Sequence, residues 1–341
     1  MNSESITPVF AYFGIDVSKD TLDICLLRET GKPLFETFDN SPAGHAKLLK
    51  WAISQARHTN RRFCLEATGT YGLALSLYLD EASEFLSVVN PAHIKYSSGD
   101  GAANTTDRSS AQKIATYARL HQPERWTPPT PQQRELIALV RHRDDLVAQQ
   151  AQVKTRLADK SPALTPAVRK SLTTLLKSFT TLIADIEAQI NQHIDSHPDI
   201  KREHDLLRSI PGIGEVSASK ILAEMLPVSQ CSSAQSAAAY AGLSPKEHRS
   251  GTSVRKTTRL SKAGNKHLRT ALFMPALIAL KYNNRIIAMA ERMKAAGKSK
   301  MVIVGAAMRK LLMIAYGVLK SGQPFTPEIA QKSNLNTLAT A

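Results

Sequence analysis

A proline-rich segment, residues 123–131 (PERWTPPTP), divides the 341-residue chain into parts with different sequence patterns. Proline fixes φ and lacks a backbone donor, so a helix or strand cannot run through this segment. Before it, short apolar runs alternate with amphipathic stretches, and after it long segments have helical periodicity. We therefore predict an α/β domain followed by parts that are mainly α-helical.

The first part has a pattern of alternating strands and helices. Two apolar runs around a turn in residues 12–27 predict a β-hairpin. A third strand is predicted at 62–66 and a fourth at 85–89, where Asn90-Pro91 stops it. Helical spacing is found at about 43–57, 73–82 and 107–119.

After the prolines, residues 132–160 and 165–197 predict two long helices with thin apolar seams. The seam residues are Leu139, Leu146 and Val153 in the first helix and Leu172, Leu175, Leu182, Ile186 and Ile190 in the second. Such helices suit a coiled-coil hairpin or a dimerisation arm, and packing on the main body is an equal alternative. The predicted domains are 8–125, 131–200 and 201–325, with a flexible tail at 326–341.

Positive charge is concentrated in the last part of the chain. Residues 1–200 hold 22 basic and 22 acidic side chains, whereas residues 201–341 hold 22 basic and 7 acidic ones and account for the whole net charge of +15. Such asymmetry indicates docking on a polyanion, usually nucleic acid. A merely solvated basic surface would usually balance its charges better.

Acidic residues occupy unusual positions in the first domain. Asp16 lies within an apolar strand, Glu66 ends another strand, and Asp107 opens a predicted helix. A carboxylate in an apolar strand is costly to bury unless it is paired or binds a metal. An RNase H-like fold uses acids in this order to gather oxygen ligands for Mg²⁺. We therefore predict that these three acids hold Mg²⁺.

A Pro-Gly-Ile-Gly turn at 211–214 separates two predicted helices. Gly212 and Gly214 permit a tight turn whose backbone N–H groups point outward at the start of the next helix. That arrangement binds phosphate without reading bases, as in helix-hairpin-helix units of DNA-handling proteins. A purely structural turn is the alternative.

The three cysteines, Cys25, Cys64 and Cys231, are far apart, which argues against a disulfide framework or a thiolate zinc site. We expect them to be small buried hydrophobes. No run reaches the ~18 consecutive apolar residues that a membrane helix needs. The first residues lack the pattern of a signal peptide, so we expect a cytoplasmic protein without a membrane partner.

Several segments together resemble one known family. IDVSKDTLDI, LEATGTYG, VVNPAHIK and NTTDRSSAQKIA resemble the N-terminal half of the DEDD transposases, the insertion sequence 110 family, which includes Piv-type DNA invertases. SIPGIGEVSA, AYAGLSP and HRSGTSVRKTTRLSKAGNKHLRTALFMPA resemble its C-terminal half, and the ordered match covers about residues 10–325. The resemblance implies a RuvC-like domain with an RNase H fold, a helical coiled-coil insert and a basic, mainly helical transposase domain.

The resemblance maps three members of the family's acidic tetrad onto the three predicted metal ligands. The fourth position is Ser110, where the family has Asp. A neutral hydroxyl is a poorer Mg²⁺ ligand than a carboxylate, which puts metal affinity and cleavage in question. Asp20 or Asp100 could compensate.

The resemblance also makes Ser250, in HRSGTS, the nucleophile that forms a covalent phosphoserine link to DNA. Serine needs activation and a fixed geometry to act in this way, and spacing alone ranks Ser250 little above Ser253 or Ser261. Gly251 next to it provides a flexible backbone that could approach a phosphodiester. The side chains predicted to contact nucleic acid nearby are Arg249, Arg255, Lys256, Arg259, Lys262, Lys266 and Arg269.

The leading hypothesis is therefore an insertion-sequence transposase, a recombinase that cuts and rejoins donor and target DNA as a homodimer or tetramer. The resemblance implies a guide RNA, or bridge RNA, that pairs with both DNAs. One alternative is a RuvC-like nuclease that uses water as its nucleophile. Another is a nucleic-acid-binding protein that Ser110 has disabled for chemistry.

Overall fold

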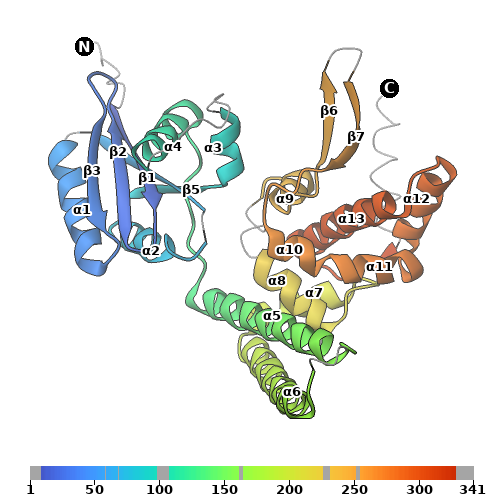
Figure 1. Cartoon of the computed structure of the whole chain (residues 1–341). Helices are drawn as coiled ribbons and strands as arrows, with labels where there is room; N and C mark the ends of the chain where they lie inside the picture. Colours follow the sequence, from blue (N-terminus) through green and yellow to red (C-terminus); the bar gives the residue numbers. More distant parts are fainter. Residues whose placement is uncertain are drawn as a thin grey trace, which may run out of the picture. The chain divides into compact units, whose positions relative to one another are not determined.

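The computed structural model describes residues 9–57, 59–67, 69–97, 107–160, 164–225, 231–250 and 254–327. The chain forms two compact units, residues 1–128 and 129–341 (Figure 1). The boundary falls between two adjacent prolines of the proline-rich segment.

The first unit is built on a five-stranded mixed sheet with the order β3-β2-β1-β4-β5. Its strands are β1 (Phe10–Val17), β2 (Thr21–Leu27), β3 (Leu34–Asp39), β4 (Asn60–Glu66) and β5 (Phe85–Val89). The first three strands are antiparallel neighbours, whereas β4 runs parallel to β1 and β5 runs parallel to β4. The predicted α/β class is confirmed for this unit.

Helices cover both faces of this sheet (Figure 1). On one face, Phe13 and Ile15 of β1 pack with residues of α1 (Pro42–Gln55) and α2 (Leu73–Glu81). On the other face, Tyr12 of β1 packs with residues of α4 (Asp107–His121). Because side chains alternate along a strand, Gly14 and Asp16 share the α4 face with Tyr12. The short helix α3 (Pro91–Ser97) follows β5.

Gly14 lies where α4 crosses the sheet. A Cβ atom at this position would collide with the backbone of Ala111 and Ala115. Gly14 is paired with Cys25 on β2 and with Cys64 on β4, so three small residues form a row across the sheet. Both cysteines are buried with α4 in one apolar cluster, as expected for small hydrophobes, whereas Cys231 is only partly buried.

The second unit begins with a helical hairpin, the arm, made of α5 (Pro131–Leu157) and α6 (Pro166–Asp195). Away from its base the arm packs through its own seam of Leu146, Val153, Leu172, Phe179 and Ile186. At its base, other arm residues, Leu136, Val140, Ile190 and Ile194, belong to the core of the second unit. The two helices of the arm therefore pack on each other along most of their length, and the base of the arm is part of the core of the second unit.

Part of the predicted seam on α6 is wrong. Leu175 and Leu182 are 43% and 50% exposed, and Val168, one heptad earlier, is 39% exposed. These three residues form an exposed apolar row on α6, because positions seven apart share one helix face. Phe179, which the heptad reading did not include, is buried in the seam instead.

The rest of the second unit is mainly helical, as predicted, with one antiparallel two-stranded ribbon, β6–β7 (Figure 1). Its elements are α7 (Pro198–Arg208), α8 (Glu215–Met225), α9 (Ala234–Tyr240), β6 (Pro245–Ser250), β7 (Val254–Leu260), α10 (Lys266–Ala271), α11 (Phe273–Tyr282), α12 (Asn284–Ala295) and α13 (Lys300–Ser321). Within the described ranges, α13 is the one helix long and apolar enough to cross a membrane, and 56% of its most apolar window is buried. Its apolar side chains form part of the core of this unit.

Three elements differ from the sequence predictions. The strand at 62–66 is the fourth in chain order, because the mostly exposed β3 precedes it. The helix α3, which the sequence analysis did not predict, starts at Pro91, in agreement with the preference of proline for the first helical turn. The basic segment around Ser250 forms the ribbon, for which the sequence analysis predicted no strands. Residues 251–253 at its tip, and the predicted tail from 328 onward, lie outside the described residues.

We predict that Gly14→Ala lowers the free energy of unfolding of the full chain by about 3 kcal/mol, because the methyl group overpacks the contact between α4 and β1. Urea unfolding followed by circular dichroism measures this change. Gly72→Ala is the control, since its Cβ would lie 3.5 Å from Leu65 Cδ1, an ordinary contact. A loss at Gly72 equal to that at Gly14 would contradict the close-approach argument.

Candidate functional site

The side chains of Asp16 and Glu66 lie on the same face of the sheet, near the carboxyl ends of the parallel strands β1 and β4. Gly14 is paired with Cys64 in the parallel ladder of β1 and β4, so Asp16 and Glu66, two residues further on, are cross-strand neighbours. Both side chains are half-buried. The predicted pair of strand acids is therefore adjacent, on the face that α4 covers.

The first turn of α4 completes this acidic group. The close approach of α4 at Gly14 brings Ser110 beside Asp16, and the Ser110 hydroxyl donates a hydrogen bond to the Asp16 carboxylate. Asp107, one turn earlier on α4, is close enough to repel Asp16. The acidic group, defined as Asp16, Glu66 and Asp107 with Ser110, therefore gathers in the first unit.

Burial and charge repulsion raise the pKa values of two members of the acidic group. Burial raises the pKa of Asp16 above its ordinary value, and repulsion from Asp107 and Asp23 raises it further, against the opposing hydrogen bond from Ser110. Burial, followed by repulsion from Asp16, also raises the pKa of Glu66. Gathering these carboxylates therefore costs free energy when all of them are ionised.

Sequence reasoning missed Asp23 as a neighbour of this group. Asp23 on β2 is paired with Asp16, so the two side chains share a face of the sheet. The Thr37 hydroxyl donates a hydrogen bond of 2.7 Å to Asp23 Oδ1. The register of the predicted hairpin contained this signal. Of the two acids named from the sequence as substitutes, Asp20 is exposed in the turn and Asp100 lies outside the described residues.

The donors of the acidic group suit a hard divalent cation, because they are carboxylate and hydroxyl oxygens whose mutual repulsion a cation would relieve. In the described part of the chain, no three acidic, histidine or cysteine side chains lie close enough to hold one ion as they stand. The donor chemistry therefore fits Mg²⁺, and holding it would require these side chains to move closer together.

The ribbon of the second unit carries the predicted nucleophile and several of the predicted cationic residues. Ser250 is the last residue of β6 and is paired with Val254, and Arg249 is paired with Arg255. Arg259 on β7, Lys262 just after it and Lys266 on α10 are exposed. Lys256 also lies on β7. The side chains of residues 247–258 lie outside the described part of the structure. Ser250 and the acidic group belong to different units.

Arg269 and Gly212 have structural contacts besides their predicted roles. Arg269 Nη1 donates a hydrogen bond of 3.0 Å to the Ala241 carbonyl, and burial lowers the pKa of this guanidinium. Gly212 has a φ of +105°, and a Cβ there would lie 2.7 Å from Ala279 Cβ on α11. At Gly214, in contrast, a Cβ would meet nothing within 4 Å. The outer part of the turn is therefore open to approach, while its inner part packs on α11.

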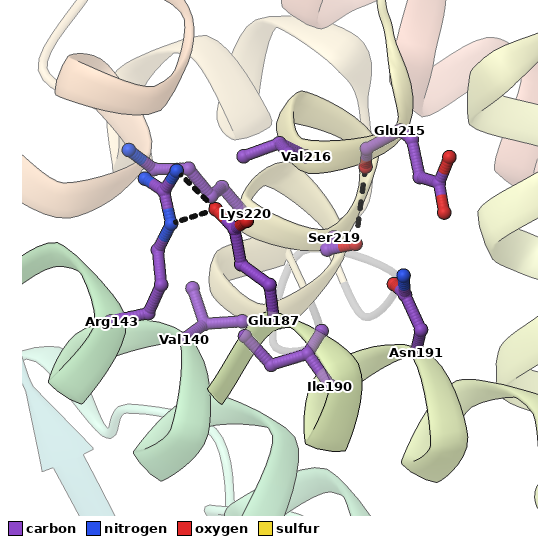
Figure 2. Close-up of a pocket in the computed structure, with 9 residues that line it drawn as sticks. All are labelled: Val140, Arg143, Glu187, Ile190, Asn191, Glu215, Val216, Ser219 and Lys220. Atoms are coloured by element: carbon purple, nitrogen blue, oxygen red, sulfur yellow. Dashed lines mark hydrogen bonds and ion pairs between the residues drawn. The ribbon is translucent and has the colours of Figure 1, made fainter. Parts of the chain in front are cut away.

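A pocket between the arm and the start of α8 has balanced charges (Figure 2). Arg143 Nη2 lies 2.6 Å from Glu187 Oε1, as the dashed lines in Figure 2 mark. Lys220 Nζ lies 2.8 Å from Asp144 Oδ2. Glu215 adds a further negative charge at the first turn of α8. Because its cations are paired, this pocket does not provide the polyanion-binding surface that the net charge predicts.

Both halves of the chain match models of transposase families. A model described as the transposase IS116/IS110/IS902 family matches residues 204–291, and a DEDD transposase model of the IS110 type matches residues 13–160. These two matches contain the turn with Gly212 and the ribbon, and the acidic group, respectively.

Whole proteins are also similar to this chain. The pilin gene-inverting proteins of Moraxella bovis and Moraxella lacunata are each 33% identical over 323 residues, which cover 93% of this chain and 98% of theirs. The transposase for insertion sequence element IS1111A of Coxiella burnetii is 24% identical over 299 residues, or 79% of this chain and 78% of its own. Since the inverting proteins match it over almost their whole length, the chain belongs to the IS110 family of insertion-sequence transposases and DNA-inverting recombinases.

Proposed function

We propose that this protein cuts and rejoins DNA through a covalent phosphoserine intermediate at Ser250, with Mg²⁺ held by Asp16, Glu66 and Asp107. The observation that carries the proposal is the acidic group, in which α4 brings Asp107 and Ser110 to the two strand acids. Such a group of carboxylates is destabilising without a cation and therefore needs a functional reason. The family matches supply DNA as the substrate class.

We further infer that the first unit is an RNase H-like, or RuvC-like, domain. Three antiparallel strands followed by two parallel ones, with acids on β1, β4 and the covering helix, support this assignment. The predicted division of the rest into a helical insert at 131–200 and a transposase domain at 201–325 also stays a proposal. The base of the arm shares a core with the elements that follow it, so these two parts would not fold independently.

The chemistry requires a balanced exchange at phosphorus. The Ser250 oxygen would form a bond to phosphorus while the bond to one bridging oxygen of the DNA backbone breaks. The proton that the serine loses would end on the departing hydroxyl. Bound Mg²⁺ would stabilise the negative charge that develops on the phosphate oxygens. The serine ester conserves the phosphodiester bond, so rejoining to a second DNA end needs no added energy source.

Nucleic acid would bind along the ribbon and α10, where Arg259, Lys262 and Lys266 are exposed. Contacts of this kind bind the phosphate backbone and weaken as salt rises. We propose both donor and target DNA as partners. The resemblance to the family supports a guide RNA as a third partner, bound by the same phosphate chemistry.

The exposed apolar row on α6 supports assembly into a homodimer or tetramer. Exposed apolar residues at heptad spacing are typical of a helix that packs against another helix. Exchange of strands between two DNA sites requires two nucleophiles, and a second copy of the chain would supply the second one. The acidic group and Ser250 would then meet within one copy or between copies.

Ser110 favours a second candidate function, a nucleic-acid-binding protein with weakened chemistry. The hydroxyl donates to Asp16 where a carboxylate would add a metal ligand. A nuclease that uses water remains the third alternative. The following changes distinguish these possibilities.

Ser250→Ala should abolish covalent attachment of protein to DNA, because the hydroxyl that forms the ester is removed. The measurement is a denaturing gel of labelled DNA after incubation with protein, Mg²⁺, guide RNA and both DNAs, with the attachment site identified by mass spectrometry. Ser253→Ala, in the same segment, is the control and should retain the adduct. Unchanged cleavage by Ser250→Ala would contradict the serine mechanism and support the nuclease.

Ser110→Asp should lower the Mg²⁺ concentration for half-maximal binding by about 10-fold or more, because it adds a carboxylate beside Asp16. Calorimetric titration with Mg²⁺ measures the affinity, and the adduct assay measures activity. Ser109→Asp, the adjacent position on α4, is the matched control. Robust activity of the unmodified chain, with no gain from Ser110→Asp, would reject the weakened-chemistry alternative.

Without divalent ions, the first unit should become less stable as the pH rises through the raised pKa values of Asp16 and Glu66. A carboxyl group whose pKa is higher in the folded state stabilises the fold at low pH and loses that contribution above the folded pKa. Mg²⁺ should restore stability at neutral pH but progressively less below the raised pKa values of Asp16 and Glu66, because a protonated carboxyl group is a poor ligand for the cation. Thermal unfolding with Mg²⁺ or with chelator measures both effects.

Asp16→Asn should remove the stabilisation by Mg²⁺ at neutral pH, because it removes the central charge of the acidic group. Glu36→Gln is the control, since β3 pairs Glu36 with Ile24, on the opposite face of the same sheet. If Mg²⁺ stabilised Asp16→Asn as strongly as the unmodified protein, the ion would bind elsewhere.

A further inference from the structure

A buried polar network lies beneath the base of the ribbon. Its centre is Glu224 of α8, which is 3% exposed. Arg141 of the arm donates to the two carboxylate oxygens of Glu224, from Nε at 2.8 Å and from Nη2 at 3.0 Å. Asn265 Nδ2 donates to Oε2 at 2.8 Å. One carboxylate therefore connects the arm, α8 and the residue that precedes α10.

Asn265 extends the network into the backbone. Its Oδ1 accepts hydrogen bonds from the N–H groups of His267 at 2.9 Å and Leu268 at 3.0 Å, which caps α10. Its own N–H donates to the Tyr240 carbonyl at 2.7 Å, and its Nδ2 also donates to the Tyr240 hydroxyl at 3.2 Å. The side chain thus fixes both the start of α10 and the end of α9.

Residues 261–264 join the ribbon to Asn265 of this network, and we call them the ribbon return. The N–H of Ser261 donates to the Ser244 carbonyl, and Lys262 donates to that of Gly242. Ser244 directly precedes β6 and Ser261 directly follows β7, so these bonds tie together the bases of both strands.

The return is also fixed by its backbone conformation. Lys262 and Gly264 have φ values of +56° and +142°, in the left-handed region. A Cβ at Gly264 would collide with the Tyr240 carbonyl oxygen, so this close approach requires glycine. The return therefore has little freedom to move independently of Asn265 and Tyr240.

Stability alone does not explain why a charged residue, Glu224, occupies this buried position. Burial alone would raise the pKa of Glu224, but the hydrogen bonds from Arg141 and Asn265 lower it below the ordinary value, so the group is ionised at neutral pH. Well-packed apolar residues commonly stabilise a fold as much as a buried ion pair or more. The ion pair, unlike apolar residues, orients Asn265 by a directional bond.

We propose that Glu224 is a positioning residue that holds the ribbon in the orientation needed for phosphodiester attack, through Asn265 and the ribbon return. Arg141 orients Glu224 from the arm, so the base of the arm and the base of the ribbon are held by the same carboxylate. This inference rests on the proposed role of Ser250, which ends β6.

The test uses the full chain with Glu224→Gln, which keeps the size of the side chain and removes its charge. The rate of covalent adduct formation at saturating DNA should fall about 100-fold, because a small misplacement of a reacting group has effects of this size. DNA affinity should stay within about 3-fold, since exposed cations on the ribbon and α10 dominate binding. Hydrogen exchange should accelerate at the amides of His267 and Leu268, which Asn265 caps.

Glu187→Gln is the matched control. It removes the ion pair of Glu187 with Arg143 on the same arm, which has no bond to the ribbon return. This variant should keep the adduct rate and the exchange of the two capped amides. An adduct rate for Glu224→Gln within about 3-fold of the unmodified protein would overturn the proposal, as would an equal loss in Glu187→Gln.

A second variant separates positioning from stability. Replacing Arg141 and Glu224 together by Met removes both charges and should preserve the free energy of unfolding. The adduct rate should nevertheless stay low, because Asn265 has lost its charged acceptor and keeps only the longer bond of 3.2 Å to the Tyr240 hydroxyl. Recovery of the rate along with stability would show a merely structural role and overturn the proposal. If Glu224→Gln does not fold, the adduct rate of the double variant tests the proposal instead.

The outcome is distinguishable from a failure of the proposed function. If Ser250→Ala left the adduct intact, the serine mechanism would fail, and hydrogen exchange would still test the network. Faster exchange of the capped amides in Glu224→Gln, without a change in Glu187→Gln, would support the positioning of the ribbon return. Unchanged exchange in both would overturn it.

Discussion

The close contact between α4 and β1 at Gly14 determines where the acidic group forms. Without a side chain at this position, the helix backbone lies directly on the strand, and Ala111 and Ala115 occupy the space that a Cβ would need. The first turn of the helix then reaches the carboxyl ends of β1 and β4. Because strand and helix are held together by packing rather than by the acids, the fold can tolerate the repulsion between them.

That repulsion explains how a serine at position 110 can stabilise the acidic group. A fourth carboxylate at this position would add to the charges that already raise the pKa of Asp16, whereas the hydroxyl donates a hydrogen bond that lowers it. The serine therefore lowers the cost of gathering the acids in the free protein, whereas a carboxylate at this position would have added an oxygen suited to a divalent cation. Asp23, across the hairpin, keeps a further negative charge beside Asp16. If the group binds Mg²⁺ as proposed, a hydroxyl at this position favours the stability of the free protein over affinity for the cation.

The sequence predicted the parts of the structure that depend on local pattern. The hairpin of residues 12–27 and the strands before Glu66 and Asn90 were predicted because apolar runs bounded by turns need no long-range information. β3 was missed because an exposed edge strand has little apolar alternation. The ribbon was missed because its strands are rich in Lys and Arg, and cationic strands resemble solvated loops.

The acidic group and the network around Glu224 also differ in how far local sequence pattern reveals them. The order Asp16, Glu66 and Asp107 could be read from the sequence because each acid has an unusual local context. Glu224 could not, since its neighbours on α8 give an ordinary amphipathic helix, and its partners come from positions 83 residues before and 41 residues after it. Long-range polar pairs leave no periodic trace in a sequence.

The row of small residues beneath α4 has a further effect on the field around the acids. Burial raises the pKa of Cys25 to about 11 and that of Cys64 to about 12. Both thiols are therefore uncharged at neutral pH and add no competing charge next to the carboxylates. The packing surface beneath the helix is therefore uncharged, and the negative charge at the strand ends comes from the carboxylates and not from the thiols.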